Sequence, residues 1–252
     1  MKKILLIILS VLLFLGTVYT SAFALNVGYI NNGGGDVNYL TNFGHSVTYI
    51  DNPVSLTAGD LAGYDAVMVT SSSAFSDSSG VGNALADYAD LGGGVVLTEF
   101  CFQGWWALEG RIMTPGYSPF GIDPGSTGYP IYNHLGSVYD ASSPLFDGVT
   151  IGIVATQYQA DMAVTIGASL IADWTSGRHA FAYNILADSK VVGLNLFPAE
   201  TSTNDLDTRR LISNALIFST NGGGSPVPEP VTMLLVGFGL LGLAGLRRKF
   251  RK

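Results

Sequence analysis

Cysteine and cationic side chains are scarce in this sequence of 252 residues. Cys101 is the only cysteine, so the chain forms no intramolecular disulfide and must be stabilised by a buried core. Of the 12 lysines and arginines, seven lie in the first three or the last six residues. Residues 25–225 therefore carry five basic and 18 acidic side chains, a formal charge of −13. Because nucleic-acid binding depends on cations that neutralise phosphates, this balance argues against a nucleic-acid partner.

Long apolar runs occur only at the two ends of the sequence. The first, residues 4–15, follows Lys2 and Lys3 and precedes the small-x-small site Ala22-Phe23-Ala24. This order predicts a signal peptide over residues 1–24, which signal peptidase would remove. A membrane span needs roughly 20 apolar residues, so the run is too short to serve as one.

The second apolar run, residues 231–246, ends in the basic cluster 247–252. An uncharged stretch with a basic end predicts a transmembrane helix whose last residues stay in the cytoplasm. It follows the triplet Pro228-Glu229-Pro230, and Arg247 and Arg248 open the basic cluster. Together, these three parts at the extreme C-terminus resemble the PEP-CTERM sorting signal. An ordinary tail anchor is the alternative interpretation.

The PEP-CTERM resemblance implies a route for the protein. An exosortase would remove the tail near the triplet, after an inner-membrane intermediate held by residues 231–246. The mature protein would then reside at the cell surface or outside the cell. PEP-CTERM proteins as a class are associated with exopolysaccharide-producing bacteria, so extracellular polysaccharide in a biofilm matrix is the partner that the tail implies.

Residues 25–220, between the two ends, predict one α/β domain, joined to the tail by residues 221–230, a Gly-rich linker and the Pro-Glu-Pro motif. Short apolar strands alternate with helical stretches in its first part, a pattern typical of a parallel sheet. The expected strands are 26–30, 45–51, 66–70, 95–100, 151–156, 168–174, 180–184 and 191–197, and the expected helices are 37–43, 81–91 and 205–218. Residues 102–150 interrupt this order as a loop insertion rich in Gly, Pro, Tyr and Ser.

Two stretches of the domain have a familiar order of elements. The segments "YDAVMVTSS" and "LADYADLGGGVVLTEF", and the later "KVVGLNLFPAETSTNDLDTRRLISNALIFS", resemble the class I glutamine amidotransferase-like superfamily, particularly its ThuA-like members. The resemblance covers most of residues 26–219 as a diffuse pattern. It implies a flavodoxin-like three-layer sandwich with a mostly parallel sheet.

Active members of that superfamily use a Gly-x-Cys-x-Gly turn after a strand and a later His-x-Glu. Cys101 follows the strand 95–100 but lacks the flanking glycines, and Phe197 stands where the pattern has histidine. A phenylalanine cannot act as a base, so a non-catalytic domain is expected. The alternative is a hydrolase that uses Cys101 or Glu99, with His134 or His179 as the base. In the purely structural interpretation, Cys101 is a half-buried small apolar side chain and the histidines lie in loops or at strand edges.

Aromatic side chains gather in the insertion. Trp105, Trp106 and Tyr117 could form a stacking platform for sugar rings, which would make the protein a carbohydrate-binding module, or they could pack the insertion. Arg111 is expected to anchor the insertion to a carboxylate such as Glu99 or Glu109.

The sequence predicts neither a cofactor nor a metal site. The Gly33-Gly34-Gly35 turn lacks the G-x-G-x-x-G spacing of dinucleotide sites. Asp205 and Asp207 lack the spacing of a calcium loop and lie where a helix is expected to start, a position that favours acidic side chains.

Overall fold

The structure is a computed structural model that describes residues 24–33, 35–123, 125, 132–199 and 205–220. The apolar run of the predicted signal peptide, the linker and the predicted transmembrane segment 231–246 lie outside the described residues. None of the described helices is long and apolar enough to cross a membrane.

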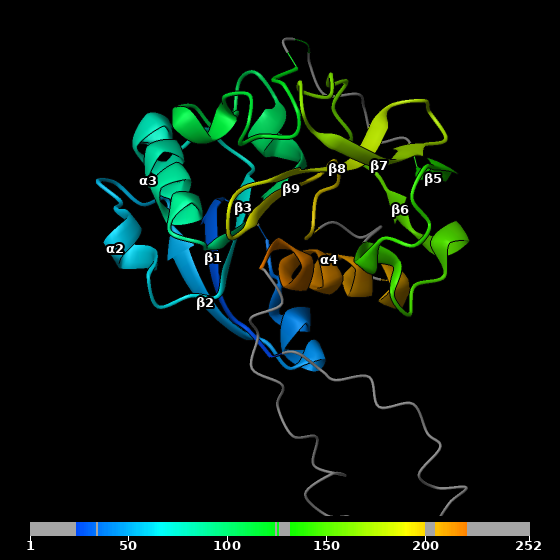
Figure 1. Cartoon of the computed structure of the whole chain (residues 1–252), viewed down its shortest axis with the longest axis horizontal. Helices are drawn as coiled ribbons and strands as arrows, with labels where there is room; N and C mark the ends of the chain where they lie inside the picture. Colours follow the sequence, from blue (N-terminus) through cyan, green and yellow to red (C-terminus); the bar gives the residue numbers. More distant parts are fainter. Residues whose placement is uncertain (1–23, 34, 124, 126–131, 200–204, 221–252) are drawn as a thin grey trace, which may run out of the picture. The chain divides into compact units, whose positions relative to one another are not determined.

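A nine-stranded sheet in the order β2-β1-β3-β4-β9-β8-β7-β5-β6 forms the centre of the described fold (Figure 1). The first five strands pair in parallel, and the remaining pairs are antiparallel. Among the described strands only β8 and β5 run against the others, so the expected mostly parallel sheet is confirmed. The bounds are β1 Asn26–Asn32, β2 Ser46–Asp51, β3 Ala66–Ser71, β4 Gly94–Thr98, β5 Asn133–Val138, β6 Ala155–Thr156, β7 Ser169–Trp174, β8 His179–Ile185 and β9 Lys190–Leu194.

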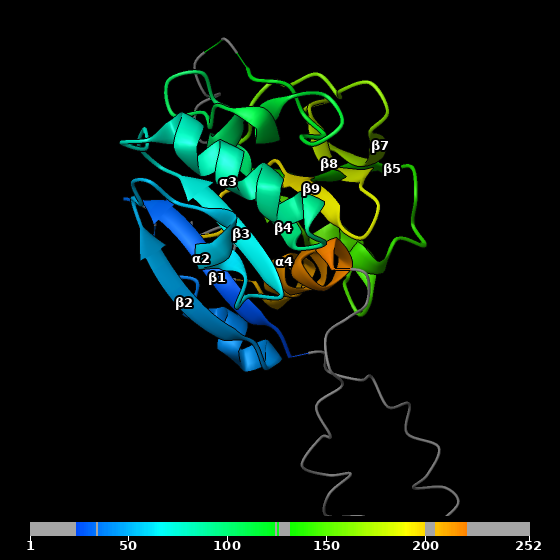
Figure 2. The same ribbon diagram turned by 60° about the vertical axis from the view of Figure 1, so that its left-hand side comes forward.

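Helices cover both faces of the sheet. Helices α2 (Ala58–Leu61) and α3 (Ser78–Asp90) lie on one face, and α4 (Leu206–Ser219) lies with the 3-10 helix η1 (Asn38–Phe43) on the other (Figures 1 and 2). Gly44 ends η1 in the left-handed conformation, with φ of 89°, as expected for a helix C-terminus. The result is the three-layer sandwich that the sequence predicted.

Strand β3 shows why this sheet needs two helical layers. All six of its residues are buried, and successive side chains of a strand point to opposite faces. Met68 packs in the core with Leu211 of α4, whereas Val67 and Val69 pack in the core with Leu85 of α3. A continuous apolar strand of this kind is stable only when both faces are covered.

The structure differs from the predicted elements in three main places. The strand expected at 151–156 is the 3-10 helix η5, Ile151–Ile153, followed by the two-residue β6, which pairs only with Asn133 and His134 of β5. Strand β5 itself lies in the predicted insertion, where its sequence NHLGSV gave no alternating pattern. The strand expected at 95–100 ends at Thr98, and a 3-10 helix, η2, follows.

The insertion is attached to α3 through Arg111. Its guanidinium lies 2.6 Å from a carboxylate oxygen of Asp87 and 2.7 Å from one of Asp90. Anchoring through Arg111 is therefore as expected, but the predicted partners Glu99 and Glu109 are wrong. Glu99 is fully buried, and Glu109 accepts a hydrogen bond from Ser79.

His45 joins the start of β1 to α4. The Leu25 N–H donates to its Nδ1 at 3.2 Å, which leaves the proton on Nε2, 2.7 Å from the Ser213 hydroxyl oxygen. The imidazole is 3% exposed, and burial lowers its pKa to about 4. Because protonation would remove the acceptor of the Leu25 N–H, the contact requires a neutral ring.

This histidine predicts a pH dependence of stability. Its pKa is about 4 in the folded chain and about 6.5 in an unfolded one, so only the unfolded chain gains a proton as the pH falls below 6.5. The free energy of unfolding should therefore fall by about 2–3 kcal/mol between pH 6.5 and 4. Urea unfolding of His45→Gln should lack this component, whereas the exposed control His134→Gln should keep it. Equal slopes of unfolding free energy against pH for the two variants would contradict the prediction.

Candidate active site

The parallel strands end at one edge of the sheet, where ligands bind in open α/β folds. Glu99 and Cys101 follow β4, and Phe197 lies shortly after β9, the strand that pairs with β4. The fold therefore brings the sequence-predicted Glu99, Cys101 and Phe197 to the same carboxyl edge.

The turn after β4 is the 3-10 helix η2, Glu99–Phe102, and all four of its residues are buried. Backbone hydrogen bonds hold it on two sides. The Glu99 N–H donates to the Leu196 carbonyl at 3.1 Å, and the Leu108 N–H donates to the Cys101 carbonyl at 3.0 Å. One bond joins the turn to the segment after β9 and the other to the insertion, so the turn is enclosed between them.

The Cys101 thiol is not prepared for nucleophilic attack. It is fully buried and lies 3.3 Å from the Val69 carbonyl oxygen, to which it donates. Burial raises the pKa of the Cys101 thiol to about 12, and the nearby Glu99 contributes in the same direction. Because the thiolate is the reactive form of cysteine, this burial disfavours nucleophilic attack by Cys101 at neutral pH.

A layer of buried hydroxyl groups lies beneath the turn. The Thr98 hydroxyl donates to the Val69 carbonyl at 2.9 Å and lies 3.0 Å from the Thr70 hydroxyl. Tyr29 hydrogen-bonds to Thr70, and burial raises the pKa of the Tyr29 phenol. Sequence reasoning missed this layer, although threonine near the end of two apolar strands was its visible signal. The hydroxyls satisfy one another and the backbone, so the layer stabilises the carboxyl edge.

Four aromatic rings occupy the carboxyl edge, and Phe100, Trp106, Tyr158 and Phe197 are here called the edge cluster. The Phe100 ring centroid lies 5.1 Å from that of Phe197, 5.2 Å from that of Trp106 and 5.5 Å from that of Tyr158. Tyr158 and Phe197 also make an edge-to-face pair at 6.1 Å. Phe197, at the position of the histidine in the amidotransferase pattern, thus takes part in ring packing.

The two candidate bases lie on other strands. His134 is exposed on β5, four strands from β4, or roughly 19 Å at about 4.8 Å per strand. His179 begins β8, two strands from β4, and its Nδ1 lies 2.7 Å from a carboxylate oxygen of Asp173. Asp173 also accepts from the Tyr139 hydroxyl. The structure therefore does not bring either imidazole to the Cys101 sulfur.

The predicted ligand-binding aromatics lie in two places. Trp105 is 81% exposed, and its neighbour Trp106 is half-buried in the edge cluster. Tyr117 instead packs toward α3, where its hydroxyl donates to Asp90 at 2.8 Å and the Arg111 guanidinium lies 5.5 Å from its ring centroid. The two tryptophans and Tyr117 thus do not form one continuous platform.

Within the part of the chain that the structure describes, no three histidine, cysteine or acidic side chains are grouped to hold a metal ion. The aspartates considered for calcium have structural contacts. Asp205 caps α4 by accepting from the Thr208 N–H at 2.7 Å, and Asp207 accepts from the Thr150 N–H at 2.9 Å.

Solved structures share this fold at low sequence identity. A cytoplasmic protein from Salmonella typhimurium LT2 has a TM-score of 0.60 and 12% identity, over 78% of this chain and 100% of that one. A ThuA-like protein from Bacteroides uniformis has a TM-score of 0.54 and 12% identity, over 83% and 98%. A GMP synthase protein from Thermoplasma acidophilum has a TM-score of 0.53 and 11% identity, over 77% and 94%. The fold is that of ThuA-like and glutamine amidotransferase-like proteins.

The C-terminus matches a family model of its own. Residues 226–249 match the PEP-CTERM protein-sorting motif, and no curated protein matches the chain. The motif includes the predicted sorting residues Pro228, Glu229, Pro230, Arg247 and Arg248. It indicates an exported protein that an exosortase processes.

The buried thiol predicts slow chemical labelling. With a pKa near 12, the thiolate fraction of Cys101 at pH 8 is about a thousandfold below that of an ordinary cysteine. A maleimide should label the folded chain at least about a hundredfold more slowly than the chain in guanidinium chloride, as followed by mass spectrometry. Cys101→Ala, which has no thiol, measures the background labelling. Comparable rates for the folded and the unfolded chain would show an accessible thiol.

Proposed function

We propose that the mature chain, residues 25–225, is a non-catalytic amidotransferase-like domain that acts at the cell surface or in an extracellular polysaccharide matrix. Signal peptidase removes residues 1–24 and an exosortase removes the tail after the protein has passed through an inner-membrane intermediate. The observation that carries the proposal is the fully buried Cys101, whose pKa is about 12, beneath a carboxyl edge filled by aromatic rings.

The chemistry of acyl transfer supports the absence of catalysis. A cysteine nucleophile needs a thiolate, a base within hydrogen-bond reach and donors for the developing oxyanion. The Cys101 thiol donates a hydrogen bond to the Val69 carbonyl, and the base position holds Phe197 in the edge cluster. A hydrolase that uses Cys101 or Glu99 would need the buried turn to open and a histidine to move across at least two strands.

The acidic surface limits the polysaccharides that the domain would meet. Residues 25–225 have a formal charge of −13, so an anionic polymer is repelled and a neutral one is favoured. In the proposed matrix role the protein would meet such polymers, and the edge cluster places aromatic rings at its carboxyl edge.

A second candidate function is carbohydrate binding at the tryptophans. Trp105 is 81% exposed, and a large exposed ring next to the half-buried Trp106 is unusual for a residue that only packs. Aromatic faces stack on the apolar faces of sugar rings, and an indole N–H can donate a hydrogen bond to a sugar hydroxyl. The same region would thus bind a glycan without changing it.

The absence of catalysis is tested with the purified mature chain. We expect hydrolysis of glutamine, simple amides and aryl glycosides to be no faster than in buffer alone. Wild type, Cys101→Ala and Glu99→Gln should show the same rate of product formation. Circular dichroism and thermal melting identify a variant that fails to fold. Turnover by the wild type that disappears in Cys101→Ala, with folding retained, would establish the hydrolase alternative.

Glycan binding is tested on an array of neutral oligosaccharides. If the tryptophans stack on sugars, Trp105→Ala should weaken binding about five- to tenfold, since a ring contact of this kind is worth about 1–1.5 kcal/mol. Trp106→Ala should weaken it similarly. Ile166→Ala, at a 92% exposed site remote in sequence, is the matched control. An unchanged profile in the tryptophan variants would exclude this site.

A further inference from the structure

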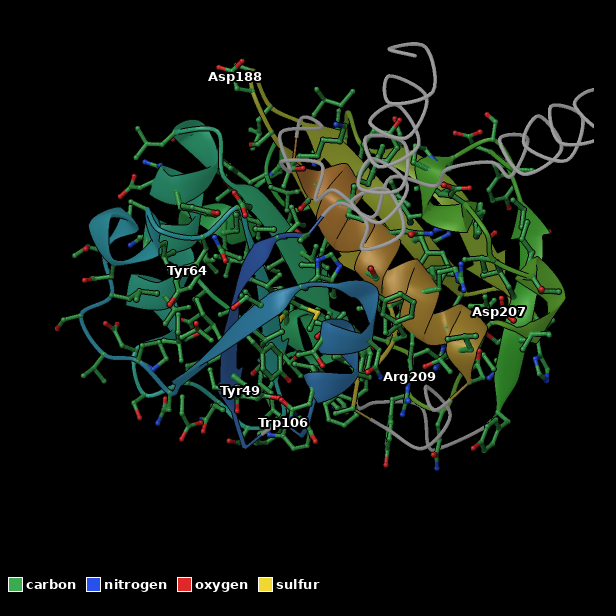
Figure 3. All side chains as sticks on the ribbon, turned by 90° about the horizontal axis from the view of Figure 1, so that it is seen from below. Tyr49, Tyr64, Trp106, Asp188, Asp207 and Arg209 are labelled. Atoms are coloured by element: carbon green, nitrogen blue, oxygen red, sulfur yellow. The ribbon has the colours of Figure 1, made fainter. Side chains whose placement is uncertain are left out.

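A pocket of about 440 Å³ opens at the edge of the sheet opposite to the edge cluster. Its walls come from segments that are remote in sequence, namely α2, the start of β3, the end of α3, the turn before β9 and Thr220 after α4. Asp188 of the pocket and Trp106 of the edge cluster lie on opposite sides of the molecule in Figure 3. Pockets of this volume hold small ligands.

The residues that line the pocket are apolar, uncharged polar or acidic. Asp65 and Asp188 contribute carboxylates from two separate loops, and among the described residues that line the pocket none is basic. Helix α3 ends there, so the negative end of its dipole adds to the same field. Burial, and then the charge of Asp65, raises the pKa of the Tyr88 phenol.

Two tyrosines form the aromatic part of the wall. The Tyr88 hydroxyl donates to the Tyr64 carbonyl at 2.9 Å, which fixes the two residues relative to each other. Gly93 permits close packing, because a Cβ there would lie 2.2 Å from the Tyr88 Cζ. The half-buried Tyr64 ring and the exposed Leu91 leave apolar surface beside the carboxylates. Asp65 is held by the Asn26 N–H, which donates to its Oδ2 at 2.7 Å.

We propose that this pocket binds an organic cation, an alkylammonium group on an apolar stem. The stem lies against the tyrosine rings and Leu91, and the ammonium group pairs with the carboxylates of Asp65 and Asp188. Because the two carboxylates come from separate loops, a ligand with an ammonium group at each end of its stem forms a second ion pair. An anion is excluded by the same field. The site is independent of the edge cluster, so its test does not depend on the proposed function.

The test is an NMR titration of the ¹⁵N-labelled mature chain with three four-carbon probes. These are 1,4-diaminobutane, n-butylammonium and n-butanol, which share a stem and differ in charge. The amides of Gly92 and Gly93, which line the pocket, report binding. We expect the diamine to bind most tightly and n-butanol least. The affinities of the two cations should fall as salt is raised, because salt screens their attraction to the carboxylates. Equal shifts with n-butanol would overturn the proposal.

Variants assign the binding to the carboxylates. Asp65→Asn and Asp188→Asn should each weaken diamine binding roughly threefold or more, as expected for partly exposed ion pairs. Asp51→Asn, which removes an exposed carboxylate at the end of β2, should bind as wild type does. If Asp65→Asn fails to fold, Asp188→Asn, at an exposed position, still tests whether a pocket carboxylate binds the diamine. Unchanged diamine affinity in folded Asp188→Asn would overturn the assignment.

Discussion

Burial of the turn after β4 is the constraint on which the rest of the site depends. Glu99 and Cys101 are both fully buried, and backbone hydrogen bonds tie the turn to the segment after β9 on one side and to the insertion on the other. In a fold whose ligands bind at the carboxyl ends of strands, this turn would be the place to expose a reactive group. In this protein the turn is covered, so the Cys101 thiol is shielded from solvent and its ionisation to a thiolate is disfavoured.

The edge cluster and the insertion follow from that constraint. Phe100, within the turn, packs against Trp106 of the insertion and against Phe197. The insertion is in turn fixed to α3 by the Arg111 pairs with Asp87 and Asp90. These surface ion pairs contribute little stability individually, but they hold the insertion against the last turn of α3. Packing at the edge and anchoring on α3 therefore support the same covered arrangement.

The two ends of the parallel strands have different chemical characters. The carboxyl edge presents aromatic rings above a layer of paired hydroxyls. The amino edge has an open pocket in which carboxylates and the end of α3 create a negative field. A sheet covered by helices on both faces leaves its two edges as the natural places for recognition. The two binding sites proposed for this domain therefore lie at opposite ends of the parallel strands.

The sequence alone determined the sorting motif, the alternation of strands and helices, and the loss of the pattern histidine at Phe197, because these are local in the chain. It also identified Arg111 as an anchor, but not its partners, because Asp87 and Asp90 meet it only after α3 packs beside the insertion. Strand β5 and the short strand β6 formed through pairing with each other and, for β5, with β7, the last strands of the sheet. The burial of Cys101, the role of His45 and the pocket at Tyr64 were decided by tertiary structure, since each joins segments that are remote in sequence.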